Sequence, residues 1–292
     1  MPLVSAGETR AVRLTLILTR RCQKRCPECP VAVRAVDMAP AILKKAISLF
    51  TAAGRRTGAV KFFGGEPLLR FDLVKSGLSW LASYGYDGAV EVGTNGVLLD
   101  APKIRYFSRR PRVQINLNSS VNVNRRFSAL PNLVWNLLIP SGDPLSALRV
   151  LARIKTVSGG ASPRVNVLPA YYRPWGAAGL VLLGKTLKRI REMSDAGEIR
   201  LENAARRGPV PLFNSGFTVD ADGRCYYGNL ILAVKTDDPA KALLAGDLNL
   251  REISLAGRAR VDYPAIAVKI FGVKAVAGGF AADKLAGRVL WE

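Results

Sequence analysis

The sequence of 292 residues contains no histidine. Histidine is the commonest general base in enzymes and a frequent metal ligand. Its absence excludes Ser-His-Asp and Cys-His nucleophile systems, and it excludes any zinc site with a histidine ligand. Chemistry in this chain must therefore depend on cysteine, carboxylates, tyrosine, lysine or a cofactor.

Long apolar stretches are also missing. No apolar run reaches the roughly 18 residues that a membrane-spanning helix needs. The opening MPLVSAGETRAVRLTLILT carries Glu8 and arginines around a short apolar run, which predicts a first strand rather than a signal peptide. We therefore expect a cytoplasmic protein without a membrane span.

Acidic residues are scarce relative to basic ones. The chain has 43 Lys and Arg against 22 Asp and Glu, a net charge of +21. Residues 102–126 hold seven basic residues and no acidic one: Lys103, Arg105, Arg109, Arg110, Arg112, Arg125 and Arg126. Two interpretations stay open, which are an anionic partner such as a nucleic acid, and a cationic surface that is simply solvated.

Cysteine is rare but concentrated. Of four cysteines, Cys22, Cys26 and Cys29 lie within eight residues, and Cys225 lies far away. This is a poor disulfide framework, whereas in a reducing compartment such a cluster more often binds metal or takes part in chemistry. Three thiolates from one loop suit an iron–sulfur cluster or zinc.

Short apolar segments alternate with helical ones from residue 11 to about 195. We predict strands at Val12–Leu18, Ala59–Phe63, Ala89–Gly93, Val113–Asn118, Leu133–Ile139 and Arg164–Leu168. We predict helices at Pro40–Ala53, Leu68–Ser83, Pro102–Ser108, Pro144–Val157 and Leu180–Met193. The alternation indicates an α/β fold of six parallel βα units, wound into a barrel or part of one, with its chemistry at the carboxyl ends of the strands.

The pattern changes after about residue 200. A hairpin is predicted with strands at Phe217–Val219 and Arg224–Tyr227 around the turn Asp220–Gly223, and the tail predicts one or two helices. We therefore divide the chain into a barrel at residues 11–200 and a small α+β extension at residues 201–292.

Three further motifs are associated with predicted strands, two at strand ends and one within a strand. Gly64-Gly65-Glu66-Pro67 follows the second, and Thr94-Asn95-Gly96 ends the third. Glycines after a strand allow the backbone to approach a ligand closely. In the fourth strand, Gln114, Asn116 and Asn118 share one face and predict a polar ligand site.

Together these motifs resemble those of the radical S-adenosylmethionine (SAM) enzymes. That family has Cys-x3-Cys-x2-Cys after strand 1, Gly-Gly-Glu-Pro after strand 2 and often Thr-Asn-Gly after strand 3, and all three occur here in order. The resemblance covers about residues 11–195 and implies a partial (βα)6 barrel. Glu28 is a departure, because the family usually has an aromatic or other hydrophobic residue just before the third cysteine.

The resemblance implies one [4Fe–4S] cluster on Cys22, Cys26 and Cys29, with SAM bound to the fourth iron. It implies that Gly64, Gly65, Glu66 and Pro67 hold the methionine amino group. Asn116 and Asn118 are candidates for the SAM ribose and carboxylate, and Thr94 and Asn95 are further candidate SAM contacts. One electron from the cluster would cleave SAM to a 5′-deoxyadenosyl radical that abstracts a hydrogen atom from a substrate, which requires no histidine.

Residues 212–255 resemble the SPASM/twitch extension of peptide- and protein-modifying members. Relatives bind an auxiliary cluster through cysteines that flank this hairpin, but Phe213 and Gly228 occupy those positions here. The resemblance therefore implies an extension without an auxiliary cluster. Cys225 lies three residues too early, and three roles stay open for it: a buried structural thiol, a hydrogen-atom donor to a substrate radical, or a fourth metal ligand.

Three functions follow from these interpretations. The first is a radical SAM enzyme that modifies a peptide or protein side chain, for example by epimerisation, with an electron donor such as a ferredoxin or flavodoxin. The second is a radical SAM enzyme acting on RNA or a nucleotide-derived metabolite, which the basic charge suggests. The third is a non-catalytic zinc protein with all four cysteines as ligands.

Overall fold

The computed structural model describes residues 13–53, 58–119, 123–203, 216–249, 252–253 and 261–291. Two compact units divide the chain. Unit 1 comprises residues 1–25, 30–94 and 211–266, and unit 2 comprises residues 26–29, 95–210 and 267–292. Each unit combines parallel strands with helices.

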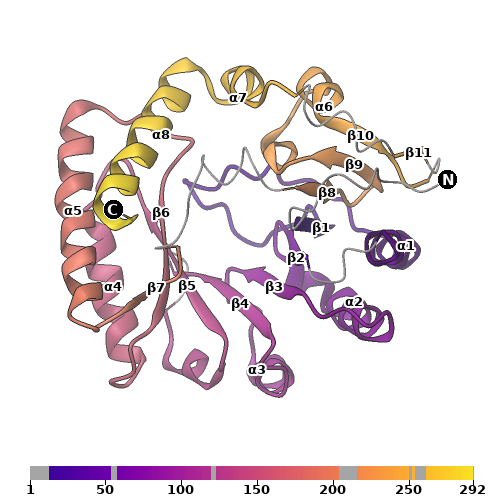
Figure 1. Cartoon of the computed structure of the whole chain (residues 1–292), viewed down its shortest axis with the longest axis horizontal. Helices are drawn as coiled ribbons and strands as arrows, with labels where there is room; N and C mark the ends of the chain where they lie inside the picture. Colours follow the sequence, from indigo (N-terminus) through magenta and orange to yellow (C-terminus); the bar gives the residue numbers. More distant parts are fainter. Residues whose placement is uncertain are drawn as a thin grey trace. The chain divides into compact units, whose positions relative to one another are not determined.

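Unit 1 begins with three parallel strands and two covering helices. The strands are β1 (Arg13–Thr19), β2 (Ala59–Gly64) and β3 (Ala89–Thr94). The helices are α1 (Pro40–Ala52) and α2 (Phe71–Ser83), and a short 3-10 helix, η1 (Pro67–Arg70), precedes α2. Figure 1 shows α1 and α2 side by side along one face of these strands.

The core of unit 1 lies between the strands and these helices. β1 is buried along nearly its whole length and β2 at alternate positions, and Leu16, Val60 and Phe62 are fully buried. Gly77 of α2 lies so close to the Phe62 ring that an added Cβ would stand 2.7 Å from it. A side chain at that position would therefore separate helix and sheet.

The extension continues the sheet of unit 1. Its strands are β8 (Phe217–Val219), β9 (Arg224–Tyr227), β10 (Leu244–Asp247) and β11 (Glu252–Ile253), with η4 (Leu230–Ala233) and α6 (Asp237–Leu243) between β9 and β10. The order across unit 1 is β11-β10-β9-β8-β1-β2-β3. β8 pairs with β1 in parallel and with β9 as an antiparallel hairpin, so the extension covers the edge of β1.

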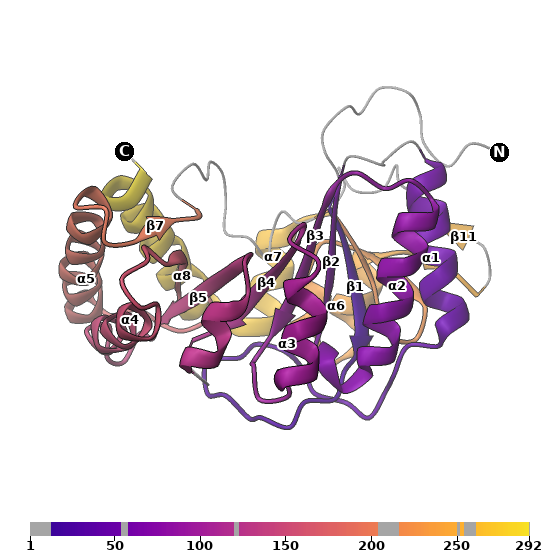
Figure 2. The same ribbon diagram turned by 90° about the horizontal axis from the view of Figure 1, so that it is seen from below.

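Unit 2 contains four parallel strands in sequence order: β4 (Val113–Asn118), β5 (Leu133–Ile139), β6 (Arg164–Pro169) and β7 (Arg200–Leu201). Its helices are α3 (Ala101–Ser108), η2 (Arg125–Ala129), α4 (Ser146–Val157), α5 (Ala177–Asp195), α8 (Val273–Ala286) and the π-helical turn η6 (Gly287–Trp291). α7 (Tyr263–Phe271) crosses the division between the units. Figure 2 shows α4 and α5 alongside β5, and α8 packs against α5.

The α/β fold predicted from the sequence is confirmed. Four strands have the predicted bounds, namely Val113–Asn118, Leu133–Ile139 and both hairpin strands. The other four differ by one residue at one or both ends. The predicted helix Leu68–Ser83 is in fact η1 followed by α2, because the Glu66 side chain caps a separate 3-10 turn. Among the described residues, no helix is both long and apolar enough to cross a membrane.

Candidate functional site

The Gly64–Pro67 loop packs directly against the start of the cysteine loop. The Gly65 N–H donates to the Thr19 carbonyl at 2.9 Å, and the Glu66 N–H donates to the Arg21 carbonyl at 2.9 Å. A Cβ on Gly64 would lie 2.2 Å from the Thr19 oxygen, and one on Gly65 would lie 2.1 Å from the Arg21 oxygen. The two glycines are therefore required for this approach, and no larger residue fits at either position.

Glu66 is fully buried and joins the ends of β2 and β3. Its Oε1 accepts from the Leu68 N–H at 3.0 Å, which caps η1, and from the Thr94 hydroxyl at 2.8 Å. Hydrogen bonds of this kind compensate for placing a carboxylate away from water. Glu66 thus holds the second and third sequence motifs in one fixed arrangement.

Asp37 organises the other side of the cysteine loop. Its carboxylate accepts from the Thr19 hydroxyl at 2.6 Å and from Arg21 Nε at 2.9 Å, and Arg70 lies at 3.7 Å. Burial acts to raise the pKa of Asp37, but these hydrogen bonds and the charges of Arg21 and Arg70 lower it overall. The ionised carboxylate therefore fixes the backbone just before Cys22.

Arg20 anchors the same segment to the extension. Arg20 is 2% exposed, and its guanidinium binds both oxygens of Asp220, at 2.8 and 2.6 Å. It also donates to the carbonyls of Ile231 and Leu232 in η4, at 3.1 and 3.0 Å. The Ala32 N–H donates to Leu232 as well, so both ends of the cysteine loop that belong to unit 1 are attached to the extension.

The three clustered cysteines lie in the irregular loop that follows β1, and none forms a disulfide. Cys22 and Cys26 are partly exposed and Cys29 is exposed. The Lys24 N–H points at Cys22 Sγ over 3.4 Å, and the Cys29 N–H closes a turn onto the Cys26 carbonyl. Accessible thiols supported by a backbone N–H fit an iron–sulfur ligand set.

The cluster site expected at Cys22, Cys26 and Cys29 stays a prediction. Among the described residues, no three Cys, Asp or Glu side chains are grouped closely enough to hold a metal ion. Cys22 belongs to unit 1, whereas Cys26 and Cys29 belong to unit 2. The assignment of these cysteines therefore rests on their chemistry and on the sequence motif.

Glu28 has a partner that the sequence did not reveal. Its carboxylate accepts from Arg173 Nε at 3.1 Å, and Arg173 lies in the loop that follows β6. The two residues are 145 positions apart. The glutamate that departs from the family pattern before Cys29 thus forms an ion pair within unit 2.

The polar face predicted on β4 continues across β5 and β6. Gln114 donates to Asn116 Oδ1 at 2.8 Å, and Asn116 is 6% exposed. Asn118 is in register with Asn136, and Asn136 is in register with Asn166, which donates to it at 3.0 Å. We did not single out Asn136 and Asn166 from the sequence, although a lone Asn in the apolar run LVWNLLI and the alternation in RVNVLP would have revealed them.

The residues at the end of β3 have two different roles. Thr94 binds Glu66 in unit 1, as described, while the Asn95 side chain accepts from the Val97 N–H in unit 2 and forms a tight turn. Gly96 has φ of 76°, and a Cβ there would stand 2.5 Å from Leu117. These contacts position the turn, and the expected SAM contacts of Thr94 and Asn95 stay predictions.

Cys225 is a buried thiol in β9. It is 3% exposed, and burial, followed by the nearby charge of Asp247, raises its pKa to about 12. Two other residues, Phe213 and Gly228, occupy the positions at which relatives have auxiliary-cluster cysteines. Gly228 has φ of 74°, and its N–H closes the hairpin onto the Gly216 carbonyl, while Phe213 lies outside the described residues. The surroundings of Cys225 are those of the structural thiol among its three candidate roles.

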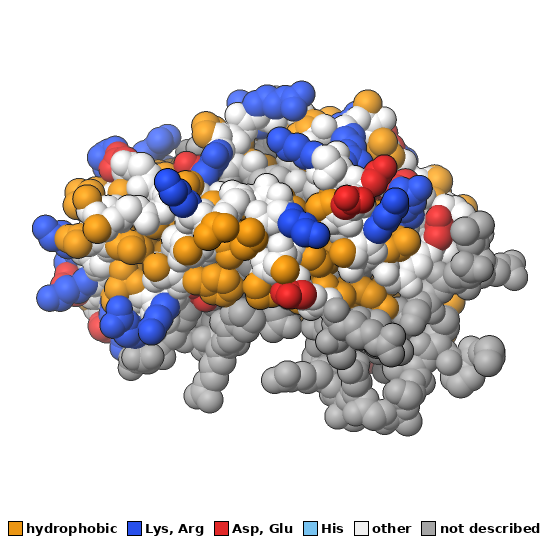
Figure 3. Space-filling view, turned by 90° about the horizontal axis from the view of Figure 1, so that it is seen from above, with side chains coloured by type: hydrophobic (Ala, Val, Ile, Leu, Met, Phe, Trp, Pro, Cys, Tyr) orange, Lys and Arg blue, Asp and Glu red, His pale blue; other side chains and the backbone are white. Residues whose placement is uncertain are grey.

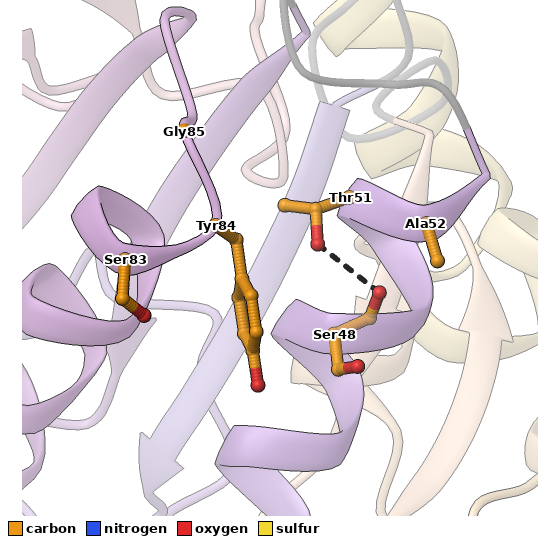
Figure 4. Close-up of a pocket in the computed structure, with 6 residues that line it drawn as sticks. All are labelled: Ser48, Thr51, Ala52, Ser83, Tyr84 and Gly85. Atoms are coloured by element: carbon orange, nitrogen blue, oxygen red, sulfur yellow. Dashed lines mark hydrogen bonds between the residues drawn. The ribbon is translucent and has the colours of Figure 1, made fainter.

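One surface hollow lies away from these motifs. It is lined by Ser48, Thr51 and Ala52 at the end of α1 and by Ser83, Tyr84 and Gly85 after α2 (Figure 4). Because each helix runs back from the carboxyl end of a strand, this hollow lies beside the amino ends of the strands. The motifs follow the opposite ends, so the hollow is separate from the candidate site.

Comparison with known proteins identifies the fold. No protein-family model matches the chain, and neither does any curated protein. The solved structure of native anSMEcpe with bound AdoMet (SAM) is 11% identical, with a TM-score of 0.70 over 95% of this chain and 96% of that chain. The structure of anSMEcpe with AdoMet and the Kp18Cys peptide is 12% identical, with a TM-score of 0.67 over 90% and 83% of the two chains.

Streptococcus suis SuiB bound to the precursor peptide SuiA is also similar. It is 12% identical, with a TM-score of 0.59 over 91% of this chain and 70% of SuiB. Both proteins are radical SAM enzymes. The fold of this chain is therefore that of the radical SAM enzymes, with an antiparallel hairpin after the barrel strands, as the sequence motifs implied.

Proposed function

We propose that this chain is a radical SAM enzyme that modifies a side chain of a peptide or protein. The observation that carries the proposal is the contact between the Gly64–Gly65 backbone and the carbonyls of Thr19 and Arg21. It attaches the loop proposed to bind SAM to the loop proposed to bind the cluster, within one unit. The fold provides independent support.

Each motif has a part in the proposal. Cys22, Cys26 and Cys29 would hold a [4Fe–4S] cluster, and Gly64–Pro67 would present backbone groups to the SAM amino group. The bound cluster and SAM would supply a 5′-deoxyadenosyl radical after one-electron reduction by a ferredoxin or flavodoxin. Glu66, buried and hydrogen-bonded to Thr94, would keep the SAM loop rigid, and the amides of Asn116 and Asn118 would donate to SAM oxygens.

A peptide substrate is the second step of the proposal. Two of the similar structures contain peptides by their descriptions, Kp18Cys with anSMEcpe and SuiA with SuiB. The hairpin formed by β8 and β9 is the element that the sequence shares with peptide-modifying members. In the proposal, Cys225 is a structural thiol of this hairpin, and the extension holds the cysteine loop through Arg20.

The metal content separates this proposal from the zinc alternative. After anaerobic reconstitution we expect about four iron and four sulfide per chain. One zinc per chain without sulfide would support the non-catalytic four-cysteine protein instead. Cys225→Ala is the matched control, because it leaves iron content unchanged if only three cysteines bind the cluster.

A deuterium-transfer experiment tests the substrate class. The reconstituted protein is reduced with SAM in the presence of perdeuterated candidate peptides, and 5′-deoxyadenosine is analysed by mass spectrometry. Deuterium in that product identifies the peptide as the source of the abstracted hydrogen. If 5′-deoxyadenosine gains no deuterium from any of the peptides but gains it from a labelled nucleotide or RNA, the peptide assignment is rejected.

A further inference from the structure

Six exposed arginines lie on and next to two neighbouring elements of unit 2, α3 and η2. We call them the arginine patch: Arg105, Arg109, Arg110, Arg112, Arg125 and Arg126. α3 carries Arg105 and is followed by the next three, and η2 begins with the last two. α3 lies on the outer side of the strands in Figure 2.

The two elements are joined directly. The Ser108 hydroxyl at the end of α3 donates to the Ala129 carbonyl at the end of η2, at 3.0 Å. Arg105 is exposed and lies three residues before Ser108, so the two are neighbours on the helix surface. The arginines of both elements thus belong to one surface rather than to two separate ones.

None of the six arginines forms an ion pair with a carboxylate in the part of the chain that the structure describes. Other exposed arginines do have such partners, for example Arg189 with Glu192 and Arg191 with Asp195. Even Lys103, inside the same sequence stretch, is paired with Asp100. The patch therefore concentrates positive charge that the protein does not neutralise.

The aromatic residues of the patch hold two of the guanidinium groups. Arg110 lies over the Tyr106 ring at 3.7 Å from its centroid, and Arg126 lies over Phe127 at 5.0 Å. Stacking on an aromatic ring fixes the plane of a guanidinium and leaves edges for hydrogen bonds. Planar, oriented guanidinium groups match phosphate oxygens in a bidentate manner.

The surroundings distinguish a nucleic acid from a protein partner. The large apolar side chains of these elements, Ile104, Phe107 and Phe127, are buried, and no large apolar side chain is exposed among the described residues of 101–130. Protein interfaces usually have an apolar centre with a few anchoring residues. A surface of arginines without such a centre fits a partner that is bound through regularly spaced phosphates.

We infer that the arginine patch binds the phosphate backbone of a nucleic acid. All six arginines belong to unit 2, and none of them is part of the SAM or cluster motifs. The inference therefore goes beyond the modification of a peptide and does not depend on it. Lys and Arg side chains are also spread over the face shown in Figure 3, so the experiment must separate a local surface from the general charge.

The test compares two variants that each lose four positive charges. The patch variant carries Arg105→Gln, Arg109→Gln, Arg125→Gln and Arg126→Gln, and the control carries Arg153→Gln, Lys185→Gln, Lys188→Gln and Lys235→Gln, all exposed positions. Binding of a fluorescein-labelled 20-nucleotide single-stranded RNA is followed by anisotropy from 50 to 200 mM salt. Thermal unfolding shows whether both variants remain folded.

We expect the patch variant to bind more than about tenfold more weakly, with a salt slope reduced by about three, since each phosphate contact in single strands contributes about 0.7. The control should stay within about twofold of the unmodified protein, the range of a small general charge effect. Equal losses in both variants would overturn the inference, because they would show an effect of net charge alone. Displacement of the RNA by polyglutamate as readily as by unlabelled RNA would also overturn it, in favour of an acidic protein partner.

The outcome is independent of the proposed function. The patch variant should still form 5′-deoxyadenosine at the rate of the unmodified protein, since none of its residues lies in the motifs proposed for SAM or the cluster. Loss of RNA binding with intact SAM cleavage would support the arginine patch alone. If the unmodified protein binds RNA but does not cleave SAM, the proposed function is rejected. The inference about the arginine patch still holds in that case if the patch variant, and not the control, loses RNA affinity.

Discussion

Cys225 shows at the scale of one residue how burial decides the role of a thiol. Its raised pKa, about 12, keeps it protonated at neutral pH, and the thiolate is the reactive form. We predict that iodoacetamide at pH 8 labels Cys22, Cys26 and Cys29 in the metal-free native protein but labels Cys225 only after denaturation. Peptide mass spectrometry measures this, and rapid native labelling of Cys225 would contradict its burial.

The same thiol gives a pH dependence. The folded pKa is raised above the unfolded value of about 8.5, so its contribution to stability is present below that pH and is lost as the pH rises toward 12. Comparing the chain with Cys225→Ala by urea unfolding at pH 7 and pH 10 isolates this contribution. Stability should fall between the two pH values more for the unmodified chain than for Cys225→Ala.

Gly65 is the residue on which the contact between the two loops depends. Gly65→Ala would place a Cβ 2.1 Å from the Arg21 carbonyl, and backbone on both sides limits relaxation. We predict a loss of about 1–3 kcal/mol in the free energy of unfolding, as for overpacked sites, together with lower iron content after reconstitution. Gly142→Ala is the matched control, since an added Cβ there meets nothing within 4 Å. If both variants behave alike, the close approach of the loops is not required.

At the scale of elements, the pair of Arg20 and Asp220 connects the cysteine loop to the extension. Both side chains are nearly inaccessible, at 3% and 9% exposure. Removing one partner leaves a buried charge without compensation, so Asp220→Asn should cost about 3–5 kcal/mol in unfolding free energy. Asp143→Asn, which removes the exposed partner of Arg149, should cost less than about 1 kcal/mol.

Stability alone would not show that the pair positions the cysteine loop. With SAM added, the electron paramagnetic resonance spectrum of the reduced cluster in Asp220→Asn should therefore differ from the spectrum of the unmodified protein under the same conditions. An unchanged spectrum would mean that Arg20 and Asp220 stabilise the extension without affecting the loop.

Asp37 makes the entry to the cysteine loop sensitive to acid. Its folded pKa is lowered, so its contribution to stability is present above the unfolded value of about 3.9 and is lost as the pH falls through the lower folded value. The stability difference between the unmodified chain and Asp37→Asn should be the same at pH 7 and pH 5 and should shrink below pH 4. Urea unfolding measures it, and a difference that is as large at pH 3 as at pH 7 would contradict the proposed network.

At the scale of the whole molecule, local periodicity made most of the fold predictable. The strands of four or more residues in the barrel follow from the sequence because they are short apolar or alternating segments and helices separate them. β7 and β11 have two residues each and therefore no period, and β10 contains too few apolar residues to show one. These elements depend on strand pairing, which a local pattern does not encode.

The motifs were likewise readable, but most of their partners were not. The sequence indicated the three cysteines and Gly64–Pro67 because their spacing is characteristic. It gave no sign that Arg20 would meet Asp220, 200 residues away, or that Glu28 would meet Arg173. Such pairs arise only when the chain folds back on itself, so local sequence reasoning does not reach them.

The central claim is that the chain cleaves SAM reductively, and one measurement tests it most directly. The anaerobically reconstituted protein is incubated with SAM and dithionite, and 5′-deoxyadenosine is quantified by liquid chromatography. We predict the product from the unmodified chain and from Cys225→Ala, and none above background from Cys22→Ala. Equal product from the unmodified chain and Cys22→Ala, or none from the unmodified chain with a full complement of iron and sulfide, would contradict the account.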